Sequence, residues 1–74
     1  MSAAKLVYKA NQIETFFQSQ APEEAAAGVA AHINKFWEPR MRREFSETLG
    51  QDDNGLKPLV IEAAKMIEFP EPVA

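Results

Sequence analysis

Four segments of the chain place apolar residues at the spacing of an amphipathic helix. Side chains that recur every three or four positions share one face of a helix, and this pattern runs through residues 3–19, 22–37, 39–49 and 56–68. No stretch alternates apolar and polar residues for long enough to indicate a strand. The pattern therefore predicts an all-α fold, a small bundle of three to four short helices forming a single domain over residues 1–74.

Prolines mark where several of these helices begin. Pro22, Pro39 and Pro58 each lie in the first turn of a predicted helix, where the missing N–H would have no helical partner in any case. The turn-forming run Gly-Gln-Asp-Asp-Asn-Gly predicts an exposed loop over residues 50–55. Further prolines at positions 70 and 72 predict an extended tail over residues 69–74.

Size and charge limit the classes of function. A 74-residue chain forms a thin core, because a domain of this size buries only about 60% of the surface that its unfolded chain exposes. A net charge of −3, from 8 basic and 11 acidic residues, gives no general attraction to nucleic acid or anionic lipid. The sequence has neither an apolar run of membrane-spanning length nor the apolar centre of a signal peptide. We therefore expect a cytoplasmic protein without a nucleic-acid or membrane partner.

The side chains needed for catalysis or metal binding are scarce. The chain has no cysteine and a single histidine, His32, so neither a Ser-His-Asp arrangement nor a zinc site has enough members. Asp52 and Asp53 lie in a loop without the alternating ligands of an EF-hand, and no serine has the Asp-Ser-Leu context of an acyl carrier protein. His32 lies at the margin of its helix's apolar face, which fits either a boundary histidine or a hydrogen bond to a partner. We expect no catalytic, cofactor-binding or metal-binding residue in this chain.

Several large apolar residues lie away from the centre of a core face. In the pairs Phe16-Phe17 and Phe36-Trp37 the two side chains point about 100° apart on a helix. We expect Phe17 and Phe36 in the core, while Phe16 and Trp37 fit core packing and partner contact equally well. Ile61 stands apart from the apolar stripe of its helix, and it is either an ordinary exposed residue or one that a partner covers.

A cluster of three arginines interrupts an otherwise acidic chain. Arg40 and Arg43 each have a glutamate four positions later, so surface pairing on one helix explains both. Arg42 instead borders the apolar stripe, and its only candidate partner in the local sequence is Glu38. Because arginine suits a bidentate contact across an interface, Arg42 is the first candidate for a salt bridge to another chain.

Three runs of sequence carry a family resemblance. They are Ala10-Asn11-Gln12-Ile13 followed by Phe16-Phe17, then His32-Ile33-Asn34-Lys35-Phe36-Trp37-Glu38-Pro39-Arg40-Met41-Arg42, then Leu56-Lys57-Pro58-Leu59 with Ala63-Ala64. The Phe-Trp-x-Pro-Arg-Met-Arg portion is the most distinctive. Over about residues 5–67 the chain resembles the delta subunit of soluble NAD-dependent formate dehydrogenases.

The resemblance implies a cytoplasmic complex that oxidises formate to carbon dioxide and reduces NAD. In such a complex a large subunit holds a molybdenum or tungsten bis-pterin cofactor, other subunits hold FMN, iron-sulfur clusters and the NAD site, and the delta chain holds no redox centre. For this chain it implies a non-catalytic accessory subunit that docks on the large subunit and stabilises the enzyme or assists its assembly. The alternative is a transient maturation chaperone for cofactor insertion. The candidate partner-binding residues are Asn11, Gln12, Phe16, His32, Trp37, Pro39, Arg40, Met41, Arg42 and Ile61.

Overall fold

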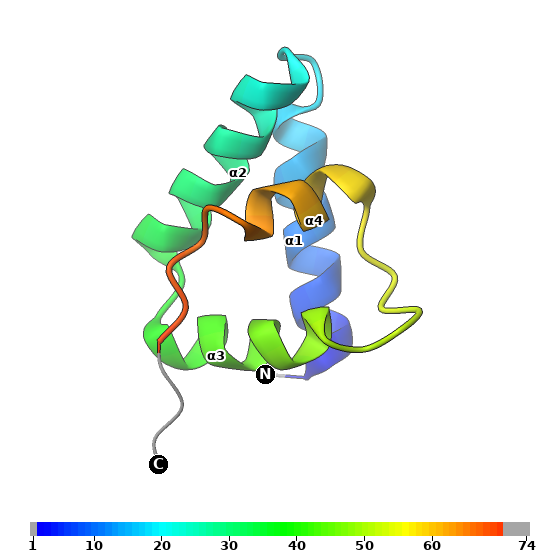
Figure 1. Cartoon of the computed structure of the whole chain (residues 1–74), viewed down its shortest axis with the longest axis vertical. Coiled ribbons are helices and arrows are strands. Elements are labelled where there is room, and N and C mark those ends of the chain that lie inside the picture. Colours follow the sequence, from blue (N-terminus) through cyan, green and yellow to red (C-terminus); the bar gives the residue numbers. More distant parts are fainter. Residues whose placement is uncertain (1, 71–74) are drawn as a thin grey trace.

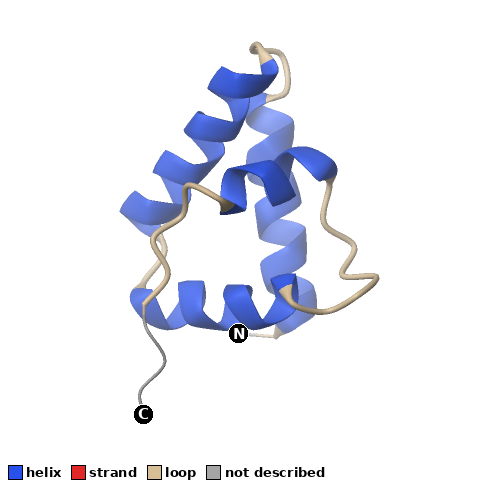
Figure 2. Cartoon of the chain, viewed as in Figure 1, coloured by secondary structure: helices blue, strands red, loops and turns tan. Residues whose placement is uncertain are grey.

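The computed structural model describes residues 2–70 and contains four helices, α1 (Ala3–Phe17), α2 (Pro22–Phe36), α3 (Pro39–Leu49) and α4 (Pro58–Ala64). Figure 1 shows α1 and α2 as an antiparallel pair, with α3 across one end of the pair and α4 lying over it. Within the described residues, helices joined by loops make up the whole structure (Figure 2). The predicted all-α fold is therefore confirmed. Residues 71–74 of the predicted tail lie outside the described part.

Three of the helices are shorter than the hydrophobic pattern predicts, the second by one residue, since it ends at Phe36 rather than at position 37. The first ends at Phe17 rather than at position 19, and the fourth covers Pro58–Ala64 rather than 56–68. Lys57 has an extended backbone with ψ of 151°, because the ring of the following proline disfavours helical geometry in the residue before it. After Ala64 the chain continues through short-range turns, in which the N–H of Met66 bonds to the carbonyl of Ala63 at 2.9 Å. Apolar spacing alone does not distinguish these turns from a helix.

Proline opens three of the helices, as the sequence predicts for α2 and α3, whereas the predicted start of the fourth helix lay two residues before Pro58. Pro22, Pro39 and Pro58 are the first residues of α2, α3 and α4. The residue before each proline has ψ between 143° and 154°, which is the extended geometry that a following proline imposes. The backbone conformation just before each of these three helices is therefore set by the steric requirement of the following proline.

The core is thin and draws on all four helices. Phe45 of α3 is the largest fully buried side chain, and it meets the inner faces of α1 and α2. Each large apolar side chain of this kind contributes about 1.5–3 kcal/mol through its burial. The buried residues of the core cluster are Leu6, Ala10, Ala26, Val29, Ala30, Ile33, Trp37, Phe45, Leu56, Val60, Ala63 and Ile67.

A glycine allows α1 and α2 to approach closely. A Cβ atom at Gly28 would lie 2.6 Å from a ring carbon of Phe17, well inside van der Waals contact. The Phe17 ring therefore lies directly over the α2 backbone at this point and packs against the core, as the sequence predicts. This contact fixes the spacing of the two helices that form the surface described below.

Candidate docking surface

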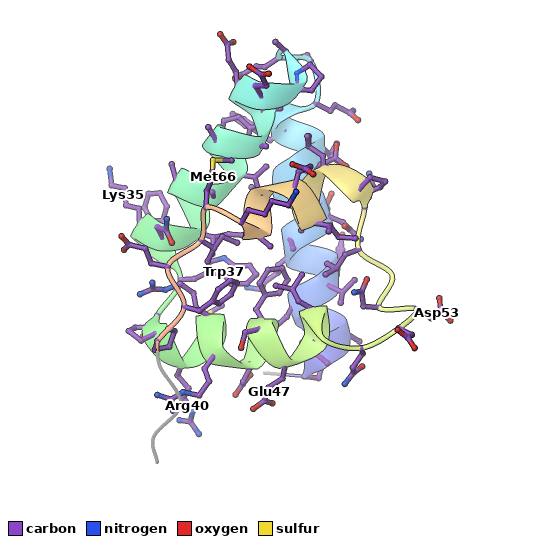
Figure 3. All side chains as sticks on the ribbon, in the orientation of Figure 1. Lys35, Trp37, Arg40, Glu47, Asp53 and Met66 are labelled. Carbon is purple, nitrogen blue, oxygen red and sulfur yellow. The ribbon has the colours of Figure 1, made fainter. Side chains whose placement is uncertain are left out.

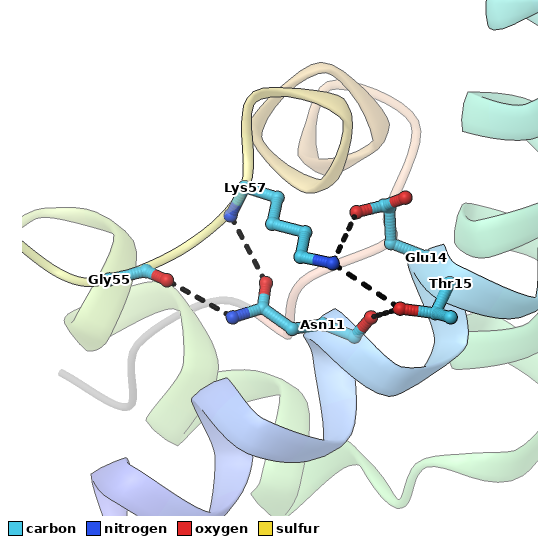
Figure 4. Close-up of polar contacts among 5 residues, drawn as sticks. All are labelled: Asn11, Glu14, Thr15, Gly55 and Lys57. Carbon is cyan, nitrogen blue, oxygen red and sulfur yellow. Dashed lines mark hydrogen bonds and ion pairs between the residues drawn. The ribbon is translucent and has the colours of Figure 1, made fainter. Parts of the chain in front are cut away.

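Asn11 of α1 bonds to the backbone of its own chain. Its side-chain N–H donates to the carbonyl of Gly55 at 3.0 Å, and its side-chain oxygen accepts from the N–H of Lys57 at 3.1 Å (Figure 4). Gly55 has a φ of 76°, a left-handed conformation that glycine adopts without strain. The amide that the sequence suggested for partner binding thus holds the loop before α4 against α1. A role in partner binding stays a prediction.

A buried carboxylate lies beside this junction. Glu14 is almost fully buried, and its carboxylate lies 3.3 Å from the ammonium nitrogen of Lys57. The same ammonium donates to the hydroxyl of Thr15 at 3.3 Å, and that hydroxyl donates to the carbonyl of Asn11 at 3.0 Å. Lys57 is half-exposed, so the pair is partly screened by water. The arrangement neutralises the buried carboxylate and fastens the start of α4 to α1.

Asn34 of α2 forms the same kind of contact at the other end of α4. Its side-chain N–H donates to the carbonyl of Met66 at 3.2 Å, and its oxygen accepts from the N–H of Glu68 at 2.8 Å. Each asparagine thus binds a carbonyl and the N–H two residues later in a non-helical segment. We call Asn11 and Asn34 the asparagine clamps. The role of Asn34 could not be predicted from the sequence, because its hydrogen-bond partners lie 32 and 34 positions away.

The junction of α2 and α3 is closed by side chains of this chain itself. Trp37 is only 7% exposed, and its ring meets that of Phe45 edge-on with centroids 5.3 Å apart. Phe69 also stacks on Phe45, with ring centroids 6.4 Å apart. The guanidinium of Arg42 donates to the carbonyl of Trp37 at 3.3 Å and to the carbonyl of Glu68. We call Trp37, Arg42, Phe45 and Phe69 the α2–α3 corner.

The corner corrects the expectation that Glu38 was the only candidate partner of Arg42. Two backbone carbonyls of the same chain accept from its guanidinium, and one of them lies in a segment that sequence spacing could not bring near. Nearby, Met41 packs half-buried against the core and Arg40 is exposed. Figure 3 shows Trp37 directed into the body of the protein and Arg40 directed away from it. Partner binding stays a prediction for Trp37, Pro39, Arg40, Met41 and Arg42.

The expectation that Phe36 belongs to the core is wrong, since its side chain is 63% exposed. The cause lies in the next residue. Trp37 is the residue at which the chain leaves the helix, with φ of −87° and ψ of 130°, so the residues that follow turn into α3 and bring Phe45 against the Trp37 ring. Trp37 turns inward against α3 and takes the core position, which leaves Phe36 outside. There the Phe36 ring lies 4.7 Å from the ring of His32 and 5.5 Å from the ammonium of Lys35.

An apolar groove runs between α1 and α2. It consists of two adjoining hollows of about 320 and 290 Å³, which share Gln12, Ile13 and His32. Phe16, 78% exposed, stands at one end and Tyr8, 56% exposed, at the other. We call this the α1–α2 groove; the residues that line it are Tyr8, Lys9, Gln12, Ile13, Phe16, Phe17, His32 and Trp37.

The groove brings together part of the predicted set. Gln12, Phe16 and His32 line it, and the side-chain N–H of Gln12 donates to the Tyr8 hydroxyl at 2.8 Å. Core packing, one of the two alternatives left open for Phe16, does not hold, because its side chain is 78% exposed and its ring lies edge-on to that of Phe17 at 5.1 Å. Tyr8 was not singled out by the sequence, although it shares a helix face with Gln12 and Phe16 at a spacing of four residues.

A second apolar hollow, of about 440 Å³, lies between α2 and α4. It is lined by aliphatic side chains together with the carboxylates of Glu23 and Glu62. Met66 lies at this hollow, and Ile61 is exposed elsewhere on the α4 surface. Ile61 is thus outside the core, as its position off the apolar stripe indicates. It does not line the α1–α2 groove.

Residues 2–70 offer neither a metal site nor a membrane-spanning helix. Histidine, aspartate and glutamate side chains in this range form no group of three that could hold a metal ion. None of the helices in the same range combines the length and apolar character needed to cross a bilayer.

Comparison with known proteins adds one finding. No curated protein and no solved structure matches the chain significantly. A family model, described as the NADH-dependent formate dehydrogenase delta subunit FdsD, matches residues 5–64. The match covers α1 to α4, including both asparagine clamps and the α1–α2 groove. The chain therefore belongs to the family of formate dehydrogenase delta subunits.

Proposed function

We propose that this delta subunit is a non-catalytic accessory subunit. It docks on the large subunit that bears the molybdenum or tungsten cofactor, and it stabilises the assembled cytoplasmic enzyme or assists its assembly. The observation that carries this proposal is the α1–α2 groove, where large aromatic side chains stay in water although the chain has a core in which others are buried.

The exposed aromatic residues are costly for an isolated protein. Tyr8, Phe16 and Phe36 are each more than half exposed, and they come from the two helices that form the groove. Aromatic side chains are enriched among the residues that anchor protein interfaces, because a rigid ring buries a large apolar area with little loss of conformational freedom. Their grouping supports a surface that another subunit covers.

We place the redox groups of the enzyme in the partner subunits. These are the molybdenum or tungsten bis-pterin cofactor, the iron-sulfur clusters, FMN and the NAD site. Iron-sulfur clusters are held by cysteine thiolates, and this 74-residue sequence contains no cysteine. Formate oxidation and NAD reduction are therefore proposed to take place in the flavin, iron-sulfur and large catalytic subunits.

The proposal is tested by purifying the enzyme through a tag on the large subunit, from cells with and without this chain. We expect the chain in a fixed ratio to the large subunit, and lower yield and thermal stability of the complex in its absence. Equal yield, cofactor content and thermal stability without the chain would contradict the proposal.

The same preparation separates a permanent subunit from a maturation chaperone. The chain is stripped from the assembled enzyme by a competing wash, and the melting temperature and cofactor content are measured again. A subunit is expected to be needed after assembly, so that stripping lowers the melting temperature. Retention of both properties, with the chain present only in immature complexes, would favour the chaperone.

A further inference from the structure

We infer that the α1–α2 groove accepts an amphipathic helix of a partner subunit, with apolar side chains along one face and carboxylates at its edges. This inference rests on the proposed function, because it names where docking takes place and the chemistry of the docked segment.

The dimensions of the groove suit a short helical segment. Tyr8, Gln12 and Phe16 follow one another at intervals of four residues along α1, so this wall extends for about 12 Å at the helical rise per residue. His32 faces the same hollows from α2, with the Phe36 ring beside it. The floor includes Ile13 and Phe17. About two turns of a helix would fill this length with side chains spaced three or four residues apart.

The backbone of the groove walls excludes an extended occupant. Both walls are α-helices, whose interior N–H and carbonyl groups are already bonded within the helix. An extended segment placed in the groove would find no row of free backbone groups, and its own would be left without partners. A helix satisfies its backbone internally and needs only side-chain contacts. Helix-in-groove recognition is therefore the mode that this surface supports.

The charges around the groove define the edges of the partner helix. Lys9 lines the groove, and Lys35 lies beside the Phe36 ring. Lys5 lies at a further hollow on α1, which shares Tyr8 and Lys9 with the groove. No residue that lines the groove in the described part is acidic, although the chain as a whole carries a net charge of −3. Carboxylates at the edges of the partner helix would meet these ammonium groups.

The hollow between α2 and α4 provides the contrast. Glu23 and Glu62 line it, and the Glu62 carboxylate is paired with the Lys65 ammonium at 3.0 Å. None of the described residues that line this hollow is basic, so it offers no ammonium group to carboxylates at the edges of a partner. The partner helix with carboxylates at its edges is thus expected to prefer the α1–α2 groove to this hollow.

Photo-crosslinking in the assembled enzyme tests the inference. A benzophenone-bearing phenylalanine is placed at Phe16 and, separately, at Phe36, with Ile61 and Met66 as control positions on other surfaces. We expect crosslinks from the first two positions to map to one helix of a formate dehydrogenase subunit, with apolar residues three or four apart and Asp or Glu beside them. Crosslinks to a second copy of this chain, to an extended segment or to a segment without acidic residues would overturn the inference.

A binding measurement gives a second readout. The other subunits are purified as a complex without this chain and immobilised, and the affinity of Phe16→Ser, Phe36→Ser and Ile61→Ser is compared with that of the original chain. We expect each phenylalanine variant to bind on the order of 30-fold more weakly, and Ile61→Ser within about 2-fold. Circular dichroism checks that all variants stay folded.

A charge variant tests the carboxylate edges. Lys9→Glu is expected to weaken binding about 2- to 5-fold, with a larger effect at low salt than at high salt. An unchanged affinity at low salt would contradict the acidic character of the partner helix.

The outcomes separate this inference from the proposed function. If the original chain does not bind the other subunits, the proposed function fails. If it binds but the phenylalanine variants bind equally well, or only Ile61→Ser weakens binding, docking stands and the α1–α2 groove is the wrong surface.

Discussion

The α2–α3 corner and the α1–α2 groove are neighbours that share α2, yet one is closed and the other is open. At the corner, Trp37 is buried against Phe45, and Arg42 bonds to two backbone carbonyls of its own chain. In the groove, Phe16 is 78% exposed, and beside the groove the exposed ring of Phe36 lies next to His32. The apolar surface left for a partner is therefore in the groove.

The contrast between the corner and the groove assigns different roles to residues of the Phe-Trp-x-Pro-Arg-Met-Arg run, residues 36–42. Phe36 and Trp37 are adjacent, but Phe36 is exposed beside His32, whereas Trp37 is buried against Phe45. Trp37 and Arg42 hold α3 and residues 68–69 in place. A loss of binding after substitution at either residue would therefore report unfolding as well as docking. Substitutions in the groove separate the two effects.

The largest expected effect on stability is at the α2–α3 corner. Trp37→Ala is expected to lower the free energy of unfolding by about 3–5 kcal/mol, because it leaves a cavity beside Phe45 in a thin core. A loss of that size would leave much of so small a domain unfolded. Urea unfolding followed by circular dichroism measures it. A loss of no more than about 0.5 kcal/mol, the value expected for Phe36→Ser, would show that the corner is no more closely packed than the groove.

A smaller effect is expected where α4 begins. Lys57→Met is expected to cost about 1–3 kcal/mol of stability, because the buried carboxylate of Glu14 loses its ammonium partner. The double variant Glu14→Gln with Lys57→Met should recover part of the loss, since no unpaired charge stays buried. Urea unfolding of the three variants measures both values. Equal stability of Lys57→Met and the original chain would show that the pair does not hold this end of α4.

The asparagine clamps are expected to contribute less. Asn34→Ala should cost about 0.5–1.5 kcal/mol, because water can replace the lost hydrogen bonds at these partly exposed groups. Amide hydrogen exchange offers a local readout, and the N–H of Glu68 should exchange faster in the variant. Asn34→Asp keeps the acceptor for that N–H and loses the donor to Met66, so it should protect Glu68 better than alanine does. Equal exchange in all three proteins would contradict the clamp.

The smallest effect on stability is expected in the groove. Phe16→Ser and Phe36→Ser should each change the free energy of unfolding by no more than about 0.5 kcal/mol, because both rings are mostly in water. The matched measurement is the binding assay on the other subunits, where the same variants should have large effects. Strong destabilisation by either variant would show that the groove belongs to the core.

The sequence by itself determined that there are four helices, where the first three begin and where α3 ends. Apolar spacing marked the four segments, and Pro22 and Pro39 fixed where α2 and α3 begin, whereas α4 begins at Pro58 rather than at the predicted position 56. These features depend on the backbone conformations of adjacent residues and on side chains within one or two turns.

Only the tertiary structure decided which polar and aromatic groups face each other. The partners of Arg42 at Glu68, of Asn34 at Met66 and of Asn11 at Gly55 lie 26, 32 and 44 positions away. The exchange of Phe36 and Trp37 arose because the chain leaves α2 at Trp37 and packs it against α3. Such contacts depend on where separate helices meet, and the periodicity of a single helix carries no information about that meeting.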